Sequence, residues 1–240
     1  MRIGTAGWGI GRDSLSEFPA TGSVLERYSA RFSAVEINSS FHRPHGEATW
    51  SRWRDAVPGT FRFSVKIPKE ISHLRKLREC DGPLDLFLGQ VRHLGEKLGL
   101  LLLQLPPKLE FEVAHGEFLK RLSGNGLAKV VCEPRHPSWF TPEADQLLRD
   151  LTIARVAADP AITPAAAEPG GWDGLSYFRL HGSPVMYRSS YADRIEALSV
   201  TLMGLENSAD DLWCIFDNTA SSAATSNALS LLKHVKSGEW

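Results

Sequence analysis

The stretch Lys129-Val-Val-Cys-Glu-Pro-Arg-His136 decides the fold, because an apolar run in it ends abruptly in charged residues. Residues 130–132 are apolar without alternation, which is typical of a strand covered on both faces. Pro134 and Pro137 end this strand, since proline cannot donate to a ladder and disfavours helix at the preceding residue. Charge therefore emerges at the C-terminal end of a buried strand, where parallel α/β folds bind ligands. The residues concerned are Glu133, Arg135 and His136.

Apolar runs and stretches of helical periodicity alternate along the rest of the chain. Further strands are predicted at residues 2–5, 34–38, 61–67, 100–105, 153–158, 177–181 and 212–216. Helices are predicted at residues 24–32, 46–57, 82–98, 114–122, 141–151, 191–205 and 224–235. Residues 161–174 are rich in Ala, Pro and Gly and show no helix. The pattern predicts an α/β protein, a single (β/α)8 TIM-like barrel over residues 1–240 that is irregular around the sixth helix. A doubly wound open sheet is the alternative.

The amino-acid composition limits which binding partners and which cellular compartment are expected. The 27 Lys and Arg residues nearly balance 28 Asp and Glu, so the chain lacks the polycationic character typical of nucleic-acid binding. The three cysteines have no C-x-x-C spacing, which favours reduced thiols and a cytoplasmic location. No secretory h-region is present, and the longest apolar run, residues 98–103, is too short to span a bilayer. We therefore expect no membrane partner, and nucleic acid is disfavoured as a ligand.

Ionisable and amide side chains gather at the predicted strand ends. They are Glu36, Asn38, Lys66, Gln104, Glu133, Arg135, His136, Asp159, Arg179, His181, Asp217 and Asn218. Burying a charge costs several kcal/mol unless it is paired, so this concentration indicates a functional site. For any single residue a closing salt bridge is an equally good explanation, for example Arg179 with Glu36.

Four of these residues are candidate catalytic groups. Glu36 and Glu133 are the preferred acid/base pair, because carboxylates flanked by Arg and Lys can differ in pKa and divide the two roles. His181 can do the same work near neutral pH, or donate to a backbone carbonyl in a structural role. Lys66 is a clamp for an anion or, if desolvated, a nucleophile.

Seven residues are candidate substrate contacts: Trp8, Asn38, Arg135, His136, Arg179, Asn218 and Tyr191. The two aromatic residues lie in predicted βα loops and either stack on a sugar or base or pack as a lid. An anion is expected at the amides of residues 218–222 or of Gly182, because loops after strands seven and eight hold phosphate in many barrels. Capping of the final helix by Thr219, Ser221 or Ser222 is the competing interpretation.

A divalent metal is the alternative use of the same carboxylates. Oxygen and nitrogen ligands are present in Glu36, Glu133, Asp159, His181 and Asp217. No short metal-ligand motif supports them, and neighbouring Arg and Lys already compensate the charge. Dinucleotide and Walker loops and a Gly-x-Ser-x-Gly elbow are absent from the sequence. No cofactor is therefore predicted.

Several motifs together resemble the YecE-like "domain of unknown function 72" family. They are Gly4-Thr-Ala-Gly-Trp8, Val35-Glu-Ile-Asn38 with Phe41 and Arg43, Lys66-Ile-Pro68 with Ile71-Ser-His73, Gln104-Leu-Pro-Pro107, Glu133-Pro-Arg-His-Pro-Ser-Trp139 and Arg179-Leu-His-Gly182. The resemblance implies a TIM-barrel-like fold and brings no activity with it. This chain differs at Asp217-Asn218, where members usually have Asn-Asn, and at Ser221-Ser-Ala223, where a Gly is usual.

These observations lead to an enzyme, a hydrolase, lyase or isomerase, that uses acid/base chemistry on a small anionic substrate, phosphorylated or carboxylated. A metal-dependent phosphoester hydrolase acting on nucleic acid is one rival, and it requires a basic, aromatic groove at the barrel mouth. A non-catalytic ligand-binding barrel is the other, and it requires no titratable group of unusual pKa. The sequence leaves the substrate's identity and the oligomeric state open.

Overall fold

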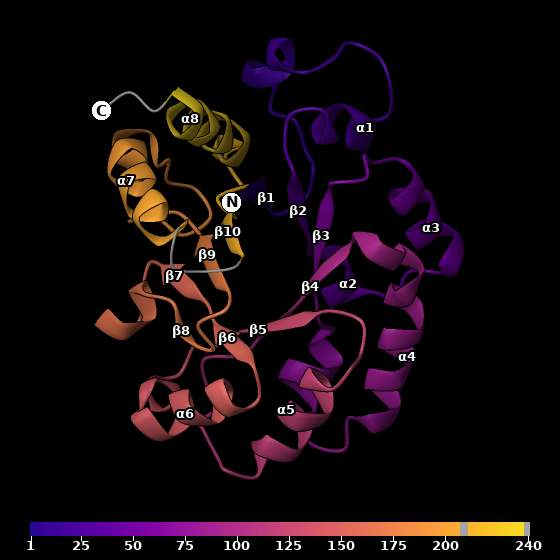
Figure 1. The fold of residues 1–240 in the computed structure, drawn as a ribbon, viewed down its shortest axis with the longest axis vertical. Helices are drawn as coiled ribbons and strands as arrows, with labels where there is room; N and C mark the ends of the chain where they lie inside the picture. Colours follow the sequence, from indigo (N-terminus) through magenta and orange to yellow (C-terminus); the bar gives the residue numbers. More distant parts are fainter. Residues whose placement is uncertain (207–210, 238–240) are drawn as a thin grey trace.

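The computed structural model of the chain describes residues 1–206 and 211–237, whose strands form two sheets (Figure 1). One sheet has the order β1-β10-β9-β7, formed by Arg2–Thr5, Leu212–Phe216, Ser176–Leu180 and Ala157–Asp159. The other has the order β2-β3-β4-β5-β6-β8, formed by Ala34–Ile37, Arg62–Lys66, Leu98–Gln104, Lys129–Glu133, Ile153–Arg155 and Gly170–Gly171. Pairing is parallel except between β6 and the two-residue β8. The predicted α/β class with parallel sheets is confirmed.

The two sheets adjoin at both of their edges. β6 and β7 are one run of chain that changes sheet at Val156, whose N–H donates to Cys132 O at 2.8 Å. At the other edge Ala6 forms a parallel bridge with Glu36, and the Gly7 N–H donates to Glu36 O at 2.8 Å. The strand predicted over residues 153–158 is therefore divided between two sheets.

Gly4 allows β1 and β2 to approach each other closely. A Cβ at this position would lie 2.2 Å from Ala34 O, which no side chain tolerates. The buried Tyr28 hydroxyl lies between the two strands, accepting from the Thr5 N–H at 2.8 Å and donating to Ala34 O at 3.1 Å. One side chain thus satisfies backbone groups at a place where the strands form no regular ladder.

Helices lie around the outside of the strands (Figure 1). They are α1 (Val24–Ser29), α2 (Ser39–His42), α3 (Glu47–Asp55), α4 (Asp81–Val91), α5 (His115–Ser123), α6 (Pro142–Asp150), α7 (Ile195–Glu206) and α8 (Ala223–Ser237). Thr141 caps α6, and its hydroxyl accepts from the Ala144 N–H at 3.3 Å, with Pro142 at the first helical position as the sequence predicts.

The structure differs from the sequence prediction in several helical segments. The helix predicted over residues 82–98 ends at Val91 and is followed by the 3-10 segment Arg92–Lys97, which is interrupted at Gly95, where φ is 54°. The sixth connection, predicted without a helix, contains only the 3-10 turn Pro164–Ala167 and β8. Short elements were not predicted: α2, the π-helix Glu70–Leu74, and the 3-10 helices Arg12–Glu17 and Pro137–Phe140. The helix predicted over residues 191–205 begins as the 3-10 helix Ala192–Arg194 and continues as α7.

Apolar side chains fill both faces of the strands. The larger cluster lies between strands and helices and includes Val130 and Cys132. The alternate residues of the strands form the second cluster, which includes Leu102, Val131 and Trp213 from both sheets. The strands are therefore buried on both sides, which explains why their sequences are apolar without alternation.

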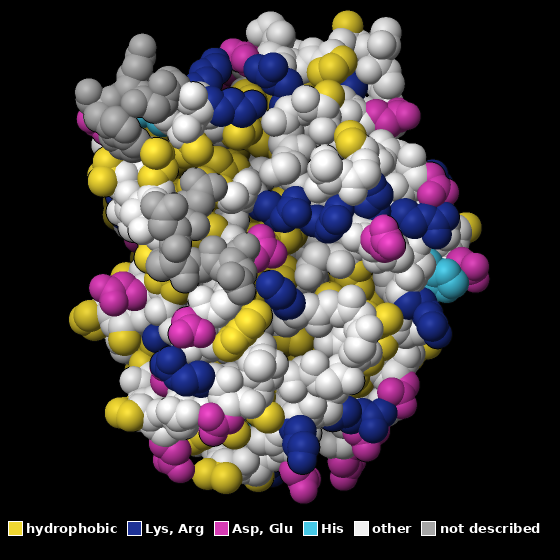
Figure 2. Space-filling view, viewed as in Figure 1, with side chains coloured by type: hydrophobic (Ala, Val, Ile, Leu, Met, Phe, Trp, Pro, Cys, Tyr) yellow, Lys and Arg dark blue, Asp and Glu magenta, His cyan; other side chains and the backbone are white. Residues whose placement is uncertain are grey.

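Charged side chains of both signs are interspersed on the face shown in Figure 2, with no continuous basic field on it. None of the helices in residues 1–206 and 211–237 has the length and apolar character needed to cross a membrane.

Candidate functional site at the strand ends

The alternation of the strands places the ionisable residues above the inner apolar cluster. Ala34, Val131 and Tyr177 belong to that cluster, and Glu36, Glu133 and Arg179 follow two positions later on β2, β5 and β9. Because side chains two apart in a strand share a face, these charges also point inward, at the C-terminal end. The same holds for Lys66 on β3, Gln104 on β4 and Asp217 directly after β10.

Arg179 is the centre of this charged cluster and is completely buried. Its Nε donates to Glu36 Oε2 at 2.9 Å and its Nη2 to Glu36 Oε1 at 2.6 Å, a bidentate pair. Nη2 also donates to Asp217 Oδ2 at 3.0 Å, and Nη1 donates to Glu133 Oε2 and, at 3.4 Å, to Gln104 Oε1. Burial opposes its charge, but the three carboxylates outweigh burial and raise the pKa of Arg179 well above its ordinary value.

Glu36 is held by structural contacts on every side. Besides Arg179, Tyr177 donates its hydroxyl to Glu36 Oε2 at 2.7 Å, and Tyr177 lies 3.0 Å from Ser64 Oγ. Burial and the Glu36 charge raise the pKa of Tyr177 well above its ordinary value. Glu36 is itself fully buried, and both of its carboxylate oxygens accept from Arg179. Its geometry is that of a residue that positions Arg179.

Glu133 connects the buried centre to the more exposed side of the cluster. Its Oε2 accepts from Arg179, while its Oε1 accepts from Arg135 Nε at 2.8 Å and lies 3.2 Å from His181 Nε2. Burial favours the neutral acid, but the positive charges of Arg179, His181 and Arg135 outweigh it and lower the pKa of Glu133 well below its ordinary value. Glu133 is therefore ionised at neutral pH.

His181 has a carboxylate at each ring nitrogen. Its Nδ1 lies 3.0 Å from Asp217 Oδ2 and its Nε2 lies 3.2 Å from Glu133 Oε1. Two acceptors favour the imidazolium, in which both N–H groups donate. Burial opposes the charge, but attraction to Glu133 and the hydrogen bonds to Asp217 and Glu133 outweigh it and raise the pKa of His181. The surroundings thus favour the protonated form of His181, which can donate a proton.

In contrast to His181, Lys66 is in surroundings that disfavour its charged form. Its Nζ donates to Gln104 Oε1 at 2.7 Å and lies 4.3 Å from the centroid of the Phe41 ring. Burial, together with the nearby Arg179 charge, lowers the pKa of Lys66 to about 8. A substantial fraction of neutral amine is therefore present in mildly alkaline solution, and this amine can accept a proton.

The structure thus brings together six residues predicted from the sequence, Glu36, Glu133, His181, Lys66, Arg135 and Arg179. Asn38 and Asn218 follow β2 and β10, and each has a buried side-chain oxygen without a hydrogen-bond partner in the described residues. The Asn218 amide is fixed by donating to Ser189 O at 2.9 Å and Asn227 Oδ1 at 2.8 Å.

Three predicted contacts have structural partners outside the cluster. Trp8 packs edge-on against Trp53 at 5.1 Å between ring centroids, and His136 Nδ1 lies 2.9 Å from Ser138 Oγ beside the following 3-10 helix. Tyr191 is buried, accepts from the Gly182 N–H at 2.9 Å and donates to Asp159 O at 3.1 Å. Its ring is therefore part of the packing of this loop, and a ligand contact at Tyr191 stays a prediction.

Four residues that belong to the cluster or border it were not among the predicted catalytic or substrate-binding residues. Gln104 and Asp217 were grouped with the strand-end residues, and Asp217 also with the possible metal ligands, but neither was given a catalytic or binding role. The Lys66 ammonium lies over the Phe41 ring, and His73 packs edge-on against Phe41 at 4.9 Å between ring centroids. Burial and then the charges of Lys66 and Arg135 lower the pKa of His73. Its short helical segment has no periodic pattern from which a place at the site could be read.

The proposed metal ligands do not form a coordination set. Glu36, Glu133 and Asp217 all direct oxygens at the Arg179 guanidinium, while Asp159 pairs with Arg194 at 2.8 Å. Within residues 1–206 and 211–237 no three His, Cys, Asp or Glu side chains are arranged to hold a metal ion. A guanidinium therefore occupies the point on which the carboxylates converge.

The predicted position of an anion coincides in part with a small cavity. It has a volume of about 170 Å³ and is lined by Gly7, Gly9 and Gly11 on one side and by Thr219, Ser222 and Thr225 on the other. It lies between the loop after β1 and the start of α8, and the Thr225 hydroxyl donates to Gly9 O at 2.9 Å. The anion site itself stays a prediction.

Comparison with known proteins places this α/β fold and its site in a family. The family model described as "Protein of unknown function DUF72" matches residues 2–239, and the chain belongs to this family. The resemblance noted in the sequence is thereby confirmed.

Two curated relatives are similar to the chain. The UPF0759 protein YecE of Escherichia coli K12 is 35% identical over 129 residues, which cover 52% of this chain and 46% of that protein. The UPF0759 protein YunF of Bacillus subtilis is 28% identical over 179 residues, which cover 70% of this chain and 60% of that protein. The chain thus spans about half the length of the curated relatives that it matches.

Solved structures share the fold at low sequence identity. A DUF72 family protein from Enterococcus faecalis has a TM-score of 0.81 and 20% identity, with 98% of this chain and 95% of that chain covered. D-psicose 3-epimerase from Clostridium cellulolyticum has a TM-score of 0.55 and 11% identity, with 99% of each chain covered. An L-ribulose 3-epimerase has a TM-score of 0.54 and 16% identity, with 99% and 92% covered.

Proposed function

We propose that the protein is an isomerase that moves a proton next to a carbonyl group in a small anionic, sugar-like substrate, phosphorylated or carboxylated. The observation that carries the proposal is the position of Lys66 and Arg135. Both residues border the His181–Glu133–Asp217 hydrogen-bonded set; Lys66 is buried, with 9% exposure, and Arg135 keeps 18% of its side chain exposed. Charges that can bind an anion thus lie beside groups that can exchange protons.

The charges of the cluster favour an anionic ligand. Its three carboxylates, Glu36, Glu133 and Asp217, are opposed by Arg179, Arg135, Lys66 and the protonated His181. The N–H donors of Arg179 are all directed at buried partners, chiefly the three carboxylates, so Arg179 does not contribute charge to an incoming ligand. Arg135 is closer to the surface and supplies the charge that an incoming carboxylate or phosphate neutralises, which leaves Lys66 to act as a base in its neutral form.

The proton transfers can be assigned to groups with suitable protonation states. The neutral Lys66 amine removes a proton from the carbon beside the carbonyl, and the C–H electron pair forms the carbon–carbon double bond of an enediol. The carbonyl oxygen takes a proton from the His181 imidazolium at the same time. Lys66 then returns the proton to the former carbonyl carbon, and the hydroxyl on the neighbouring carbon loses its proton to His181 as its C–O bond becomes the new carbonyl. Both groups are thereby regenerated and the carbonyl has moved by one carbon. Two groups whose pKa values are shifted in opposite directions are suited to this division of roles.

The finer architecture is part of the same proposal. The two sheets adjoin at Ala6–Glu36 and at Val156, so we treat them as one eight-stranded (β/α)8 barrel in a single domain over residues 1–240, with the cluster at its mouth. The likeness in fold to two sugar 3-epimerases is consistent with carbonyl isomerisation. Cys80, Cys132 and Cys214 are buried free thiols, which suits the reducing cytoplasm that we propose for the protein.

The test is an assay of deuterium exchange into the substrate, which does not require the product to be known. The protein is incubated in D2O with a panel of aldoses, ketoses, sugar phosphates and sugar acids, and proton NMR detects loss of the signal beside the carbonyl. We expect exchange in a phosphorylated or carboxylated member of the panel at mildly alkaline pH. Lys66→Met and His181→Gln should each abolish it, whereas Lys120→Met, which changes an exposed lysine on α5, should leave it unchanged.

Three outcomes would count against the isomerase as proposed. Exchange that persists in Lys66→Met would remove the lysine from the reaction. Absence of exchange throughout the panel, together with saturable binding of a panel member, would favour the non-catalytic ligand-binding barrel. Activity that appears only on added divalent metal and a phosphodiester would favour the metal-dependent hydrolase.

A further inference from the structure

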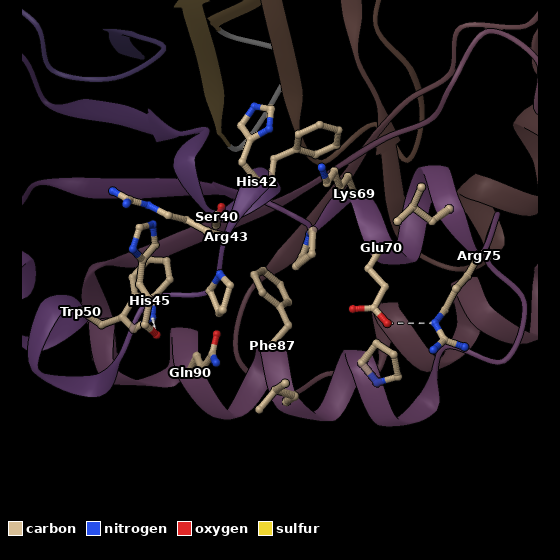
Figure 3. A pocket seen from close by; sticks show the side chains of 16 residues that line it. Ser40, His42, Arg43, His45, Trp50, Lys69, Glu70, Arg75, Phe87 and Gln90 are labelled. Atoms are coloured by element: carbon tan, nitrogen blue, oxygen red, sulfur yellow. Dashed lines mark hydrogen bonds and ion pairs between the residues drawn. The ribbon is translucent and has the colours of Figure 1, made fainter.

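A second cavity lies outside the charged cluster, between α4 and the segments that follow β2 and β3 (Figure 3). Its volume is about 480 Å³, within the range of roughly 300–1,000 Å³ typical of small-molecule sites. Phe87 and Gln90 point into it from α4, and Glu70 points toward it from the opposite side (Figure 3). The cavity therefore has walls from three separate segments of the chain.

The body of this cavity is apolar. Phe41, Trp50, Pro68 and Phe87 form its interior, and Leu74 and Leu86 lie at its edge. The last two are 70% and 64% exposed, although leucine is among the residues most often buried. Two exposed leucines beside an apolar hollow form a surface that gains free energy when an apolar molecule covers it.

The interior wall is rigid. Trp50 is completely buried, and its Nε1–H donates to His45 O at 3.0 Å. His45 packs edge-on against Trp50 at 5.3 Å between ring centroids, and its Nε2 lies 2.8 Å from Ser39 Oγ. A preformed wall lowers the entropy cost of binding, because few side chains need to be ordered.

The rim carries an excess of positive charge. Glu70 is neutralised by Arg75, whose Nε lies 3.1 Å from its Oε1, as the dashed line in Figure 3 shows. Arg43 and Lys69 also line the cavity and form no ion pair with any described residue. Two exposed cations are thus available to an anionic ligand.

The backbone of one wall is unusual. Glu70–Leu74 is a π-helical turn, closed by the Arg75 N–H donating to Glu70 O at 2.9 Å, and Lys76 and Leu77 follow it with φ of 51° and 66°. Single π-turns are rare and occur frequently at functional sites. Here the extra residue of the turn brings Leu74 to the edge of the cavity.

We propose that this cavity is a binding site for a small amphipathic anion, a molecule with a hydrocarbon or aromatic body and one acidic head group. The body occupies the hollow lined by Phe41, Trp50 and Phe87, and the head group lies at the rim between Arg43 and Lys69. The site is separate from the proposed isomerase reaction and does not depend on it. Phe41 is the wall that the two share, because the Lys66 ammonium lies over the same ring.

Isothermal titration calorimetry with decanoate, decyl phosphate, decanol and acetate tests this site, each below the concentration at which it forms micelles. We expect one equivalent of decanoate or decyl phosphate to bind with a negative heat-capacity change, decanol to bind more weakly and acetate not to bind. Whichever of the two anions binds with the higher affinity identifies the preferred head group as carboxylate or phosphate. Failure of both anions to bind would refute the proposal.

Variants assign the binding to this cavity. Leu86→Asp changes an exposed position, so it should fold, and it should abolish binding of decanoate and decanol alike. The double variant Arg43→Ala, Lys69→Ala should weaken decanoate on the order of fivefold, as two exposed charges do, and leave decanol unchanged. Leu15→Asp, at a leucine exposed elsewhere, and Lys120→Ala are the matched controls. The assignment would be overturned if decanoate still bound to Leu86→Asp, or if its affinity were unchanged in the double variant that lacks both rim cations.

Discussion

Arg179 on β9 and Glu36 on β2 form a bidentate ion pair across the interior, with Nη2–Oε1 and Nε–Oε2 distances of 2.6 and 2.9 Å. The two strands belong to different sheets, so this pair connects the sheets at the level of the site. Both side chains are completely buried. Each charge is therefore compensated only by the other members of the cluster, and stability and site geometry depend on the same contacts.

Arg179→Met should be among the most destabilising substitutions in the described chain. It removes the cation on which Glu36, Glu133 and Asp217 converge and leaves buried carboxylates without compensation. Breaking a buried pair costs about 3–5 kcal/mol of unfolding free energy, measured by urea denaturation. Arg121→Met, which breaks an exposed pair with Asp85, should have little effect. Adding Glu36→Gln to Arg179→Met should recover part of the loss, and equal stability of single and double variants would contradict this account.

Lys66 should make the protein more stable as the pH rises from about 8 toward 10.5. Burial lowers the pKa of Lys66 to about 8 from a value of 10.5, so the unfolded chain binds the proton more tightly than the folded chain in this interval. The penalty for charged Lys66 is complete below pH 8 and disappears above 10.5, and its upper bound is about 3 kcal/mol. The difference in unfolding free energy between Lys66→Met and the unaltered chain, measured from pH 7 to 10, isolates this residue. A difference independent of pH would count against the shift.

His181 and His73 should titrate in opposite directions from an ordinary histidine. The pKa of His181 is raised, because its carboxylate partners outweigh burial, whereas burial and the charges of Lys66 and Arg135 lower that of His73. Protonated His181 therefore adds stability below pH 6.5, and that stability is lost as the pH rises through its folded pKa. Ring resonances in an NMR titration should give midpoints on either side of 6.5. In Glu133→Gln the His181 midpoint should fall, and an unchanged midpoint would exclude Glu133 as its cause.

One substitution should have opposite effects at two glycines. Gly4→Ala places a Cβ 2.2 Å from Ala34 O between two strands and should lower the unfolding free energy by about 1–3 kcal/mol, as overpacking does. Gly204→Ala lies on the exposed face of α7 with nothing within 4 Å of the new Cβ. It should raise stability by up to about 1 kcal/mol through helix propensity. Thermal unfolding followed by circular dichroism compares the two, and a stabilising Gly4→Ala would contradict the close approach of β1 and β2.

The strand ends were predictable because the signal that marks them is local. Glu133 follows three apolar residues and precedes a proline, so the end of β5 could be placed without knowledge of its neighbours. The change of sheet at Val156 could not be placed, since residues 153–158 are one mostly apolar run and the break depends on which strands lie alongside. Short elements such as α2 contain too few residues for a periodic pattern.

The sequence alone could not predict which of the charged residues form ion pairs with one another. Every member of the cluster except Tyr177, Phe41 and His73 is at or next to a strand end, yet Glu36 and Glu133 looked equally suited to catalysis. The register between distant strands decides that Glu36 meets Arg179 and Tyr177 together, while Glu133 also reaches Arg135 and His181. Tyr177 carried no signal of its own, because an aromatic residue in a buried strand is ordinarily part of the core.

The guanidinium at the centre of the site also has a consequence for the order in which the chain folds. Arg179 is 143 residues from Glu36 and 46 residues from Glu133 in the sequence, so both carboxylates leave the ribosome long before their cation. Until β9 is in place, Glu36 lacks its arginine and Glu133 has only Arg135, so bringing these two strand ends together would bury like charges with incomplete compensation. The first two-thirds of the chain should therefore keep that end hydrated and open during synthesis. Closure of the two sheets and completion of the site then become a single late event.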